Sequence, residues 1–146
     1  MALYFFDTSA LAKNYHLETG SPQVDTLLNE PQSTFFISRL SVVEIQSVFA
    51  LKVCTGVLTE SEFHNLRHRF LADVANRRWQ VIRLLPSHFQ KAERLINRYA
   101  TSRSLRTLDA LQLSVALSLL ERSLIDYFVC ADKNLCTGAA LESLSV

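Results

Sequence analysis

Short apolar runs alternate along this chain with longer stretches whose apolar residues recur every three or four positions. The short runs predict strands at 2–6, 34–38, 80–85 and 126–131, with a possible fifth at 143–146. The longer stretches predict helices at 8–15, from 20, at 41–53, from 59, from 87, at 107–122 and at 134–141. Strands separated by helices favour a parallel sheet covered on both faces. We therefore expect an α/β fold, a three-layer sandwich with a central four- to five-stranded parallel sheet.

Helix start and stop signals support several of these boundaries. Thr59 and Glu62 form a capping box at the start of one helix, and Gly56 follows the end of the helix before it. Pro86 is expected to close the strand at 80–85, and Ser87 to cap the helix that follows.

The length and composition predict one compact domain over residues 1–146. Hydrophobic residues make up 49% of the 146, with only three glycines and three prolines. We expect no signal peptide, because the first residues lack a basic segment, and the richest apolar stretch, 110–120, is too short to span a membrane. Cys54 and Cys130 lie in apolar stretches and Cys136 leaves an odd count, so buried thiols in a reducing cytoplasm are expected.

Positive charge is concentrated in the second half of the chain, although the net charge is only +1. Between Arg67 and Arg106 there are ten basic residues and two acidic ones. Such a segment is typical of a protein that contacts a polyanion. The alternative is that these are ordinary solvated residues on helix surfaces.

Four carboxylates carry the candidate chemistry: Asp7, Glu44, Asp109 and Asp132. Each follows a predicted strand or lies in the first turns of the helix after one. The carboxyl ends of parallel strands meet at one edge of a sheet, where ligands bind. Four acids gathered there repel one another unless a divalent cation neutralises them, which indicates a metal site with oxygen ligands.

Each carboxylate also has a structural explanation. Asp7 and Asp132 can each cap the helix that follows them. Glu44 can complete a capping box with Ser41, and Asp109 can lie in the first turn of a helix capped by Thr107, where the helix dipole favours an anion. The metal site therefore depends on the joint pattern of the four.

Other kinds of site are poorly supported. The four histidines, His16, His64, His68 and His88, have no zinc-ligand spacing. Glycine-rich phosphate loops and a serine nucleophile elbow are both absent from the sequence.

The order and spacing of Asp7-Thr8-Ser9, Glu44, Leu108-Asp109-Ala110 and Ala131-Asp132 resemble the PIN-domain family, and within it the VapC-type toxins of bacterial toxin–antitoxin pairs. The resemblance covers nearly the whole chain. It implies an endoribonuclease dependent on Mg²⁺ or Mn²⁺, a homodimer, and a cognate antitoxin protein that plugs the active site. It assigns the four acids to metal binding and catalysis, with Thr8 or Ser9 as the supporting hydroxyl.

The residues suggest how such an enzyme would work. Asp7 and Asp109 are expected to bind metal most tightly, with Glu44 binding metal or orienting a water and Asp132 holding a second ion or acting through water. RNA phosphates would be held by basic residues such as Arg103 and Arg106.

Two other functions are open. A catalytically silent module that binds metal or protein is favoured by Cys130, which stands where the family commonly has a Thr or Ser. A receiver-like signalling domain also clusters acids at strand ends, but Thr8-Ser9 after Asp7 argues against it. Preference for RNA over DNA rests on the resemblance alone.

Overall fold

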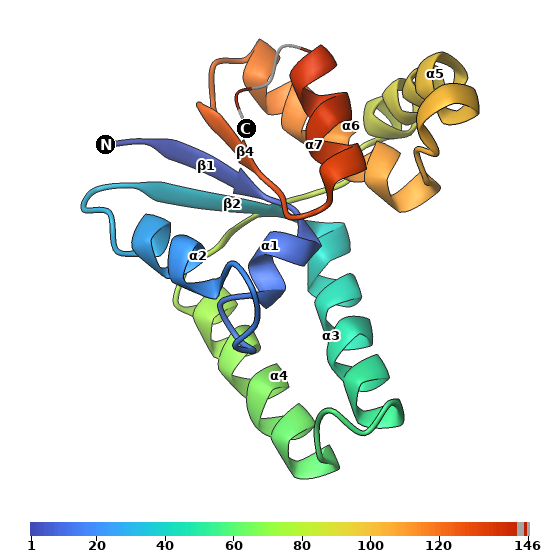
Figure 1. Ribbon diagram of the computed structural model, residues 1–146. Helices are drawn as coiled ribbons and strands as arrows, with labels where there is room; N and C mark the ends of the chain where they lie inside the picture. The colour runs from blue at the N-terminus through green and yellow to red at the C-terminus, as the bar shows by residue number, and fades with distance from the viewer. Residues whose placement is uncertain (143–144, 146) are drawn as a thin grey trace.

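The computed structural model describes residues 1–142 and 145, and alternates strands with helices as the sequence predicts. The strands are β1 (Leu3–Phe6), β2 (Thr34–Ser38), β3 (Gln80–Ile82) and β4 (Tyr127–Val129). The helices are α1 (Thr8–Ala12), α2 (Ser21–Leu28), α3 (Arg39–Cys54), α4 (Glu60–Ala75), α5 (Pro86–Arg103), α6 (Thr107–Glu121) and α7 (Lys133–Leu141). Figure 1 shows the sheet between helices α1 to α4 on one side and helices α5 to α7 on the other. The predicted α/β three-layer architecture is confirmed.

The four strands form one parallel sheet in the order β3-β2-β1-β4. Phe5 of β1 is paired with Phe36 of β2 on one side and Phe128 of β4 on the other. The possible fifth strand at 143–146 lies outside the described residues, except for Ser145. The carbonyl of Ser145 accepts a 2.7 Å hydrogen bond from the backbone N–H of Phe128, at the free edge of β4.

Alternating side chains of β1 divide the apolar core into two parts. Phe5 points to a cluster built with α5, α6 and α7, whereas Tyr4 and Phe6 point to a cluster with α1 to α4. Neighbouring side chains of a strand face opposite sides of a sheet, so a nearly all-apolar strand needs cover on both faces. The two clusters provide that cover and hold the sheet between them.

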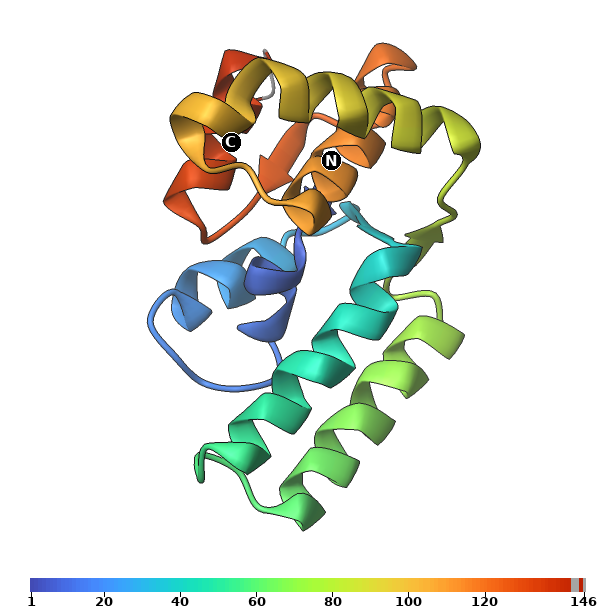
Figure 2. The ribbon, with the colours of Figure 1, turned by 90° about the vertical axis from the view of Figure 1, so that its right-hand side faces the viewer.

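Helices α3 and α4 form an antiparallel pair that extends away from the sheet, as Figure 2 shows. Arg67 of α4 donates a 2.8 Å hydrogen bond from Nε to Oε1 of Gln46 on α3. The turn between the helices includes Gly56 at φ +80°, a left-handed conformation that glycine adopts without steric cost. Thr59 caps α4 as predicted, because its side-chain oxygen accepts a hydrogen bond from the backbone N–H of Glu62. The Thr59 hydroxyl also donates to Oε1 of Glu62, in place of the backbone N–H that a full capping box would use.

Several predicted boundaries are wrong. Helix α3 begins at Arg39 and is capped by Ser38, not Ser41. Pro86 begins α5 instead of closing a strand, because its fixed φ suits the first turn of a helix. The residue before α6 is Arg106, so Thr107 is not its cap. Strands β3 and β4 are three residues each, shorter than their apolar runs, and α1 ends at Ala12 instead of Tyr15. Within the described residues, no helix is long and apolar enough to cross a bilayer.

Candidate active site

All four predicted carboxylates lie at the carboxyl-end side of the sheet, where the first turns of four helices meet. Asp7 joins β1 to α1, and Asp132 stands before α7, just after β4. Glu44 is in the second turn of α3 and Asp109 in the first turn of α6. Electrostatic repulsion links them, because Asp7 interacts with Asp109 and Glu44, and Asp109 with Asp132 and Glu44. The fold therefore brings together acids that are up to 125 positions apart in the sequence.

Asp7 is the most deeply buried of the four, with 4% of its surface exposed. It caps α1, since its Oδ1 accepts a 2.9 Å hydrogen bond from the backbone N–H of Ala10. Burial raises the pKa of Asp7 from 3.8 to about 7, and repulsion from Asp109 and Glu44 adds to that rise. Hydrogen bonds from Ala10 and Ser9 oppose it. The predicted capping role of Asp7 is confirmed. Ionising this buried carboxyl group costs free energy, and a bound cation would lower that cost.

Glu44 does not form the capping box with Ser41 that the sequence allowed. Its Oε1 instead accepts hydrogen bonds from the hydroxyl of Thr8, at 2.8 Å, and from the side-chain amide of Gln112, at 2.9 Å. The backbone N–H of Ser41 is bonded by Ser38. Because Ser38 takes over the cap, Glu44 is free to turn toward the other acids.

Asp109 is half-buried and lies opposite the exposed guanidinium of Arg106. The Nε of Arg106 is 3.6 Å from Oδ2 of Asp109. Burial raises the pKa of Asp109, and the charge of Arg106 opposes this shift. Repulsion from Asp132 and Glu44 raises it further. The ionisation of Asp109 is therefore coupled to the charges of Asp132 and Glu44.

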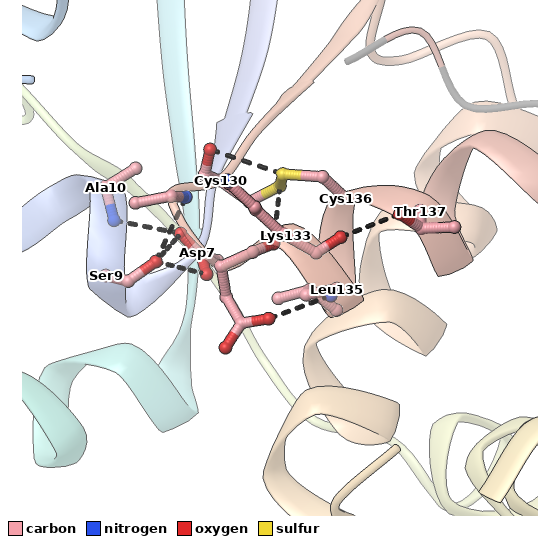
Figure 3. The surroundings of a disulfide bond; sticks show 10 residues. Asp7, Ser9, Ala10, Cys130, Lys133, Leu135, Cys136 and Thr137 are labelled. Atoms are coloured by element: carbon pink, nitrogen blue, oxygen red, sulfur yellow. Dashed lines mark hydrogen bonds between the residues drawn. A yellow bond between two sulfur atoms is a disulfide. The ribbon is translucent and has the colours of Figure 1, made fainter. Parts of the chain in front are cut away.

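Asp132 is half-buried and caps α7, with Oδ1 accepting a 3.0 Å hydrogen bond from the backbone N–H of Leu135. Cys130 and Cys136, which lie on either side of this residue in the sequence, form a disulfide. Figure 3 shows this disulfide and its surroundings. The expectation of buried thiols is wrong, since Cys130 is oxidised and Cys54 is exposed on α3. Sequence spacing alone could not reveal the pair, because the turn into α7 is what brings the two Cα atoms to 6.0 Å.

Comparison with known proteins places the fold and the family. The sequence model of the PIN domain matches residues 4–133. The chain belongs to the PIN domain family. A search of curated proteins by sequence finds no match.

Two solved structures share this fold. One is Mycobacterium tuberculosis VapC20, described as a toxin that cleaves the sarcin–ricin loop; it superposes with a TM-score of 0.72 at 13% identity, covering 92% of this chain and 93% of that one. The other, a protein of Pyrobaculum aerophilum, has a TM-score of 0.59 at 18% identity, covering 94% and 79%. At such low identities the likeness concerns the fold.

The carboxylates of this PIN domain fit a divalent cation by the chemistry of their donors. Mg²⁺ and Mn²⁺ prefer oxygen ligands, and like-charge repulsion among the four acids is what a cation neutralises. Among the described residues, no three His, Cys, Asp or Glu side chains already lie close enough to hold one ion. Mg²⁺ is commonly bound by one or two carboxylates and keeps water in its other positions.

The two arginines predicted to hold RNA lie near the start of α6. Arg103 is in the last turn of α5, and Arg106 immediately precedes α6; both side chains are exposed. A cavity of about 710 Å³ lies elsewhere, between α5 and the far end of α6. The four acids do not line it.

Three further residues of the site were missed by the sequence analysis. Ser38, Ser41 and Gln112 are all fully buried and form a hydrogen-bonded group beside Glu44. One signal was available, because Gln112 is a polar residue in a helix otherwise apolar nearly all round. It lies three residues after Asp109, a spacing that places both side chains on the same face of a helix.

Proposed function

We propose that this PIN domain is a divalent-metal-dependent endoribonuclease that hydrolyses RNA phosphodiester bonds, and that it is the toxin of a toxin–antitoxin pair. The family supports a nuclease. The likeness in fold to VapC20, a loop-cleaving toxin, supports the toxin assignment. The choice of RNA over DNA follows the resemblance of the acidic motifs to VapC-type toxins.

The observation that carries the proposal is the convergence of Asp109 and Glu44 on the buried Asp7, where burial and the charges of both acids raise the pKa of Asp7 to about 7. A carboxyl group that caps a helix and accepts two hydrogen bonds would ordinarily ionise readily. Here burial and the charges of Asp109 and Glu44 oppose ionisation. Perturbed carboxyl groups of this kind gather at functional sites, and a bound cation would stabilise the ionised form.

The residues take separate roles in this proposal. Asp7 and Asp109 hold the Mg²⁺ or Mn²⁺ ion, Glu44 binds it or orients the attacking water, and Asp132 holds a second ion or acts through water. Thr8 and Ser9 support the acids with hydroxyl hydrogen bonds. When bound, the cation activates water and stabilises the charge of the departing oxygen.

The proposal also covers the substrate and the protein partners. Arg106 is exposed beside Asp109, and Arg103 is exposed in the last turn of α5; both would bind phosphates that flank the cleaved bond. A cognate antitoxin would plug the site, and the toxin would act as a homodimer in the cytoplasm, as the resemblance to VapC-type toxins implies.

Cleavage of a mixed RNA pool tests the proposal. The purified chain should cut RNA with Mn²⁺ or Mg²⁺, cut none with EDTA, and leave a matched DNA pool intact. Asp109→Asn should lower the rate at least a hundredfold, because a neutral amide binds the cation weakly. Asp25→Asn is the control, because Asp25 is exposed on α2, and it should cut like the parent.

A catalytically silent module that binds metal or protein is the second candidate. It is favoured by Cys130, which is tied to Cys136 where the family commonly has a hydroxyl. The same assay decides between the two, since a silent module binds Mn²⁺ in a titration and leaves the RNA uncut at every metal concentration.

A further inference from the structure

Gln112 is an amide buried in the most apolar helix of the chain. Only 2% of its surface is exposed, and its neighbours Leu111 and Leu113 belong to the core. A buried amide is costly unless its donors and acceptor are hydrogen-bonded. Its partners therefore show what the side chain does.

The amide joins three elements at the acidic site. Its Oε1 accepts a 2.9 Å hydrogen bond from the hydroxyl of Ser38, at the end of β2. Its Nε2 lies 2.9 Å from Oε1 of Glu44 and 2.7 Å from the hydroxyl of Ser41, both on α3. The hydroxyl of Thr8, on α1, is 3.0 Å from the same nitrogen.

Chemistry fixes which way round the amide lies. The hydroxyl oxygen of Ser38 already accepts the backbone N–H of Ser41, so its proton is available to the carbonyl oxygen of Gln112. A flipped amide would place that oxygen against the carboxylate of Glu44, where two acceptors repel. The nitrogen of Gln112 therefore faces Glu44.

In this arrangement only one carboxylate oxygen of Glu44 accepts hydrogen bonds from the described neighbouring side chains. Oε1 accepts from Thr8 at 2.8 Å and from Gln112 at 2.9 Å. Among the described residues, Oε2 has no hydrogen-bond partner. Glu44 can then offer a single oxygen, which suits the octahedral coordination that Mg²⁺ demands.

We propose that Gln112 is a positioning residue that holds Oε1 of Glu44 and thereby presents Oε2 to the divalent cation. The inference rests on the proposed metal-dependent nuclease and deepens it. Groups that bind a metal ligand from behind fix its orientation, and their loss typically lowers metal affinity or activity roughly ten- to a hundredfold.

The first test replaces the amide with an apolar side chain of the same length. Gln112→Met should remain folded at the assay temperature, as thermal unfolding would show. It should bind Mn²⁺ roughly tenfold more weakly in calorimetric titration, and cut RNA with a lower kcat but an unchanged KM. Ser114→Ala is the matched control, because Ser114 is buried on the same helix and bonds only the carbonyl of Leu111. A folded Gln112→Met with parental Mn²⁺ affinity and kcat overturns the proposal.

The second test needs no cation and no RNA. In NMR spectra of the metal-free protein, the side-chain amide protons of Gln112 should exchange slowly and should shift when Glu44 is changed to Gln. The exposed amides of Gln32 and Gln90 serve as internal controls. A Gln112 amide that exchanges like theirs, or that ignores Glu44→Gln, overturns the proposed contact even if Gln112→Met does not fold.

The two proposals fail in different ways. If the parent binds Mn²⁺ and cuts no RNA, the nuclease assignment falls while the Mn²⁺ affinities of parent and Gln112→Met still test the role of Gln112. If the parent binds no Mn²⁺, the positioning role is overturned as well, because there is no cation to which Oε2 could be presented.

Discussion

The hydroxyl of Ser9 lies within hydrogen-bond distance of both carboxylate oxygens of Asp7, at 2.9 and 2.7 Å. The same oxygen accepts a 3.2 Å hydrogen bond from the backbone N–H of Ala131, immediately before Asp132. One small side chain therefore connects the acid after β1 with the loop after β4. Ser9 both stabilises the charge of Asp7 and holds the loop after β4 against the start of α1.

Replacing Ser9 with Ala should raise the pKa of Asp7 further. The Ser9 hydroxyl favours the ionised form, and a hydrogen bond to a charged group contributes about 1.5 kcal/mol, or roughly one pH unit. An NMR titration of the metal-free protein measures the shift directly. Ser102→Ala, an exposed serine on α5, should leave it unchanged. A downward shift in Ser9→Ala would contradict this account.

Asp7 should make the metal-free protein less stable as the pH rises. An unfolded Asp ionises near pH 4, whereas folded Asp7 keeps its proton up to about pH 7. Between these values the native state binds more protons than the unfolded state, so the free energy of unfolding falls as the pH increases. Asp7→Asn removes this dependence and should be more stable than the parent at pH 8 by about 2–4 kcal/mol.

Chemical denaturation in EDTA at pH 4 and pH 8 measures the effect. The gain in Asp7→Asn should disappear at pH 4, where the parent carries a protonated Asp7. Saturating Mg²⁺ should stabilise the parent and leave Asp7→Asn nearly unchanged, because a ligand that binds only the native state shifts unfolding by mass action. Equal stability of the two proteins at both pH values would contradict the raised pKa of Asp7.

Thr8→Val should weaken catalysis without unfolding the protein. Valine has nearly the same shape, but it cannot donate the 2.8 Å hydrogen bond to Glu44 or pair with Ser41. We expect a loss of about 1–2 kcal/mol in stability and a roughly tenfold slower cleavage. Thermal unfolding and single-turnover cleavage measure the two effects. Thr26→Val is the control, because Thr26 is exposed on α2 and its hydroxyl bonds the carbonyl of Pro22.

Arg106→Ala should weaken RNA binding and reduce its salt dependence. Each phosphate contact to a single strand contributes about 0.7 to the slope of log K against log salt. Loss of one contact should therefore flatten the slope by about that amount. Arg122, exposed just beyond the other end of α6, provides the matched control, and Arg122→Ala should keep the parental slope. An unchanged slope in Arg106→Ala would remove this residue from the RNA-binding surface.

The native protein should present one reactive thiol. Cys54 is exposed, whereas Cys130 and Cys136 are joined. Alkylation followed by mass spectrometry should label one cysteine before reduction and three after it. In Cys136→Ser, both remaining cysteines should react without reduction. Three labelled cysteines in the unreduced parent would mean that the pair is open in solution.

Much of the fold could be predicted from local patterns. The nearly all-apolar run at Leu3–Phe6 has to be buried on both faces, and this places it inside a sheet covered by helices on either side. Strands and helices in alternation then leave few topologies. Helix ends were harder: Ser41 and Thr107 are both good caps, but Ser38 and Arg106 occupy those positions. Which of several neighbouring caps is used depends on where the preceding strand or helix ends.

The sequence by itself indicated the four candidate carboxylates and the edge at which they meet, because strands that alternate with helices form a parallel sheet whose carboxyl ends share one edge. Only the tertiary structure decided how each acid is held. Glu44 turned out to be bonded by Thr8 and Gln112, which are 36 and 68 positions away. Burial of Asp7 and the Gln112 contacts arise from packing between distant segments, and the Cys130–Cys136 bond arises from the turn into α7. No local pattern contains them, since each depends on which side chains the folded chain brings within a few ångströms.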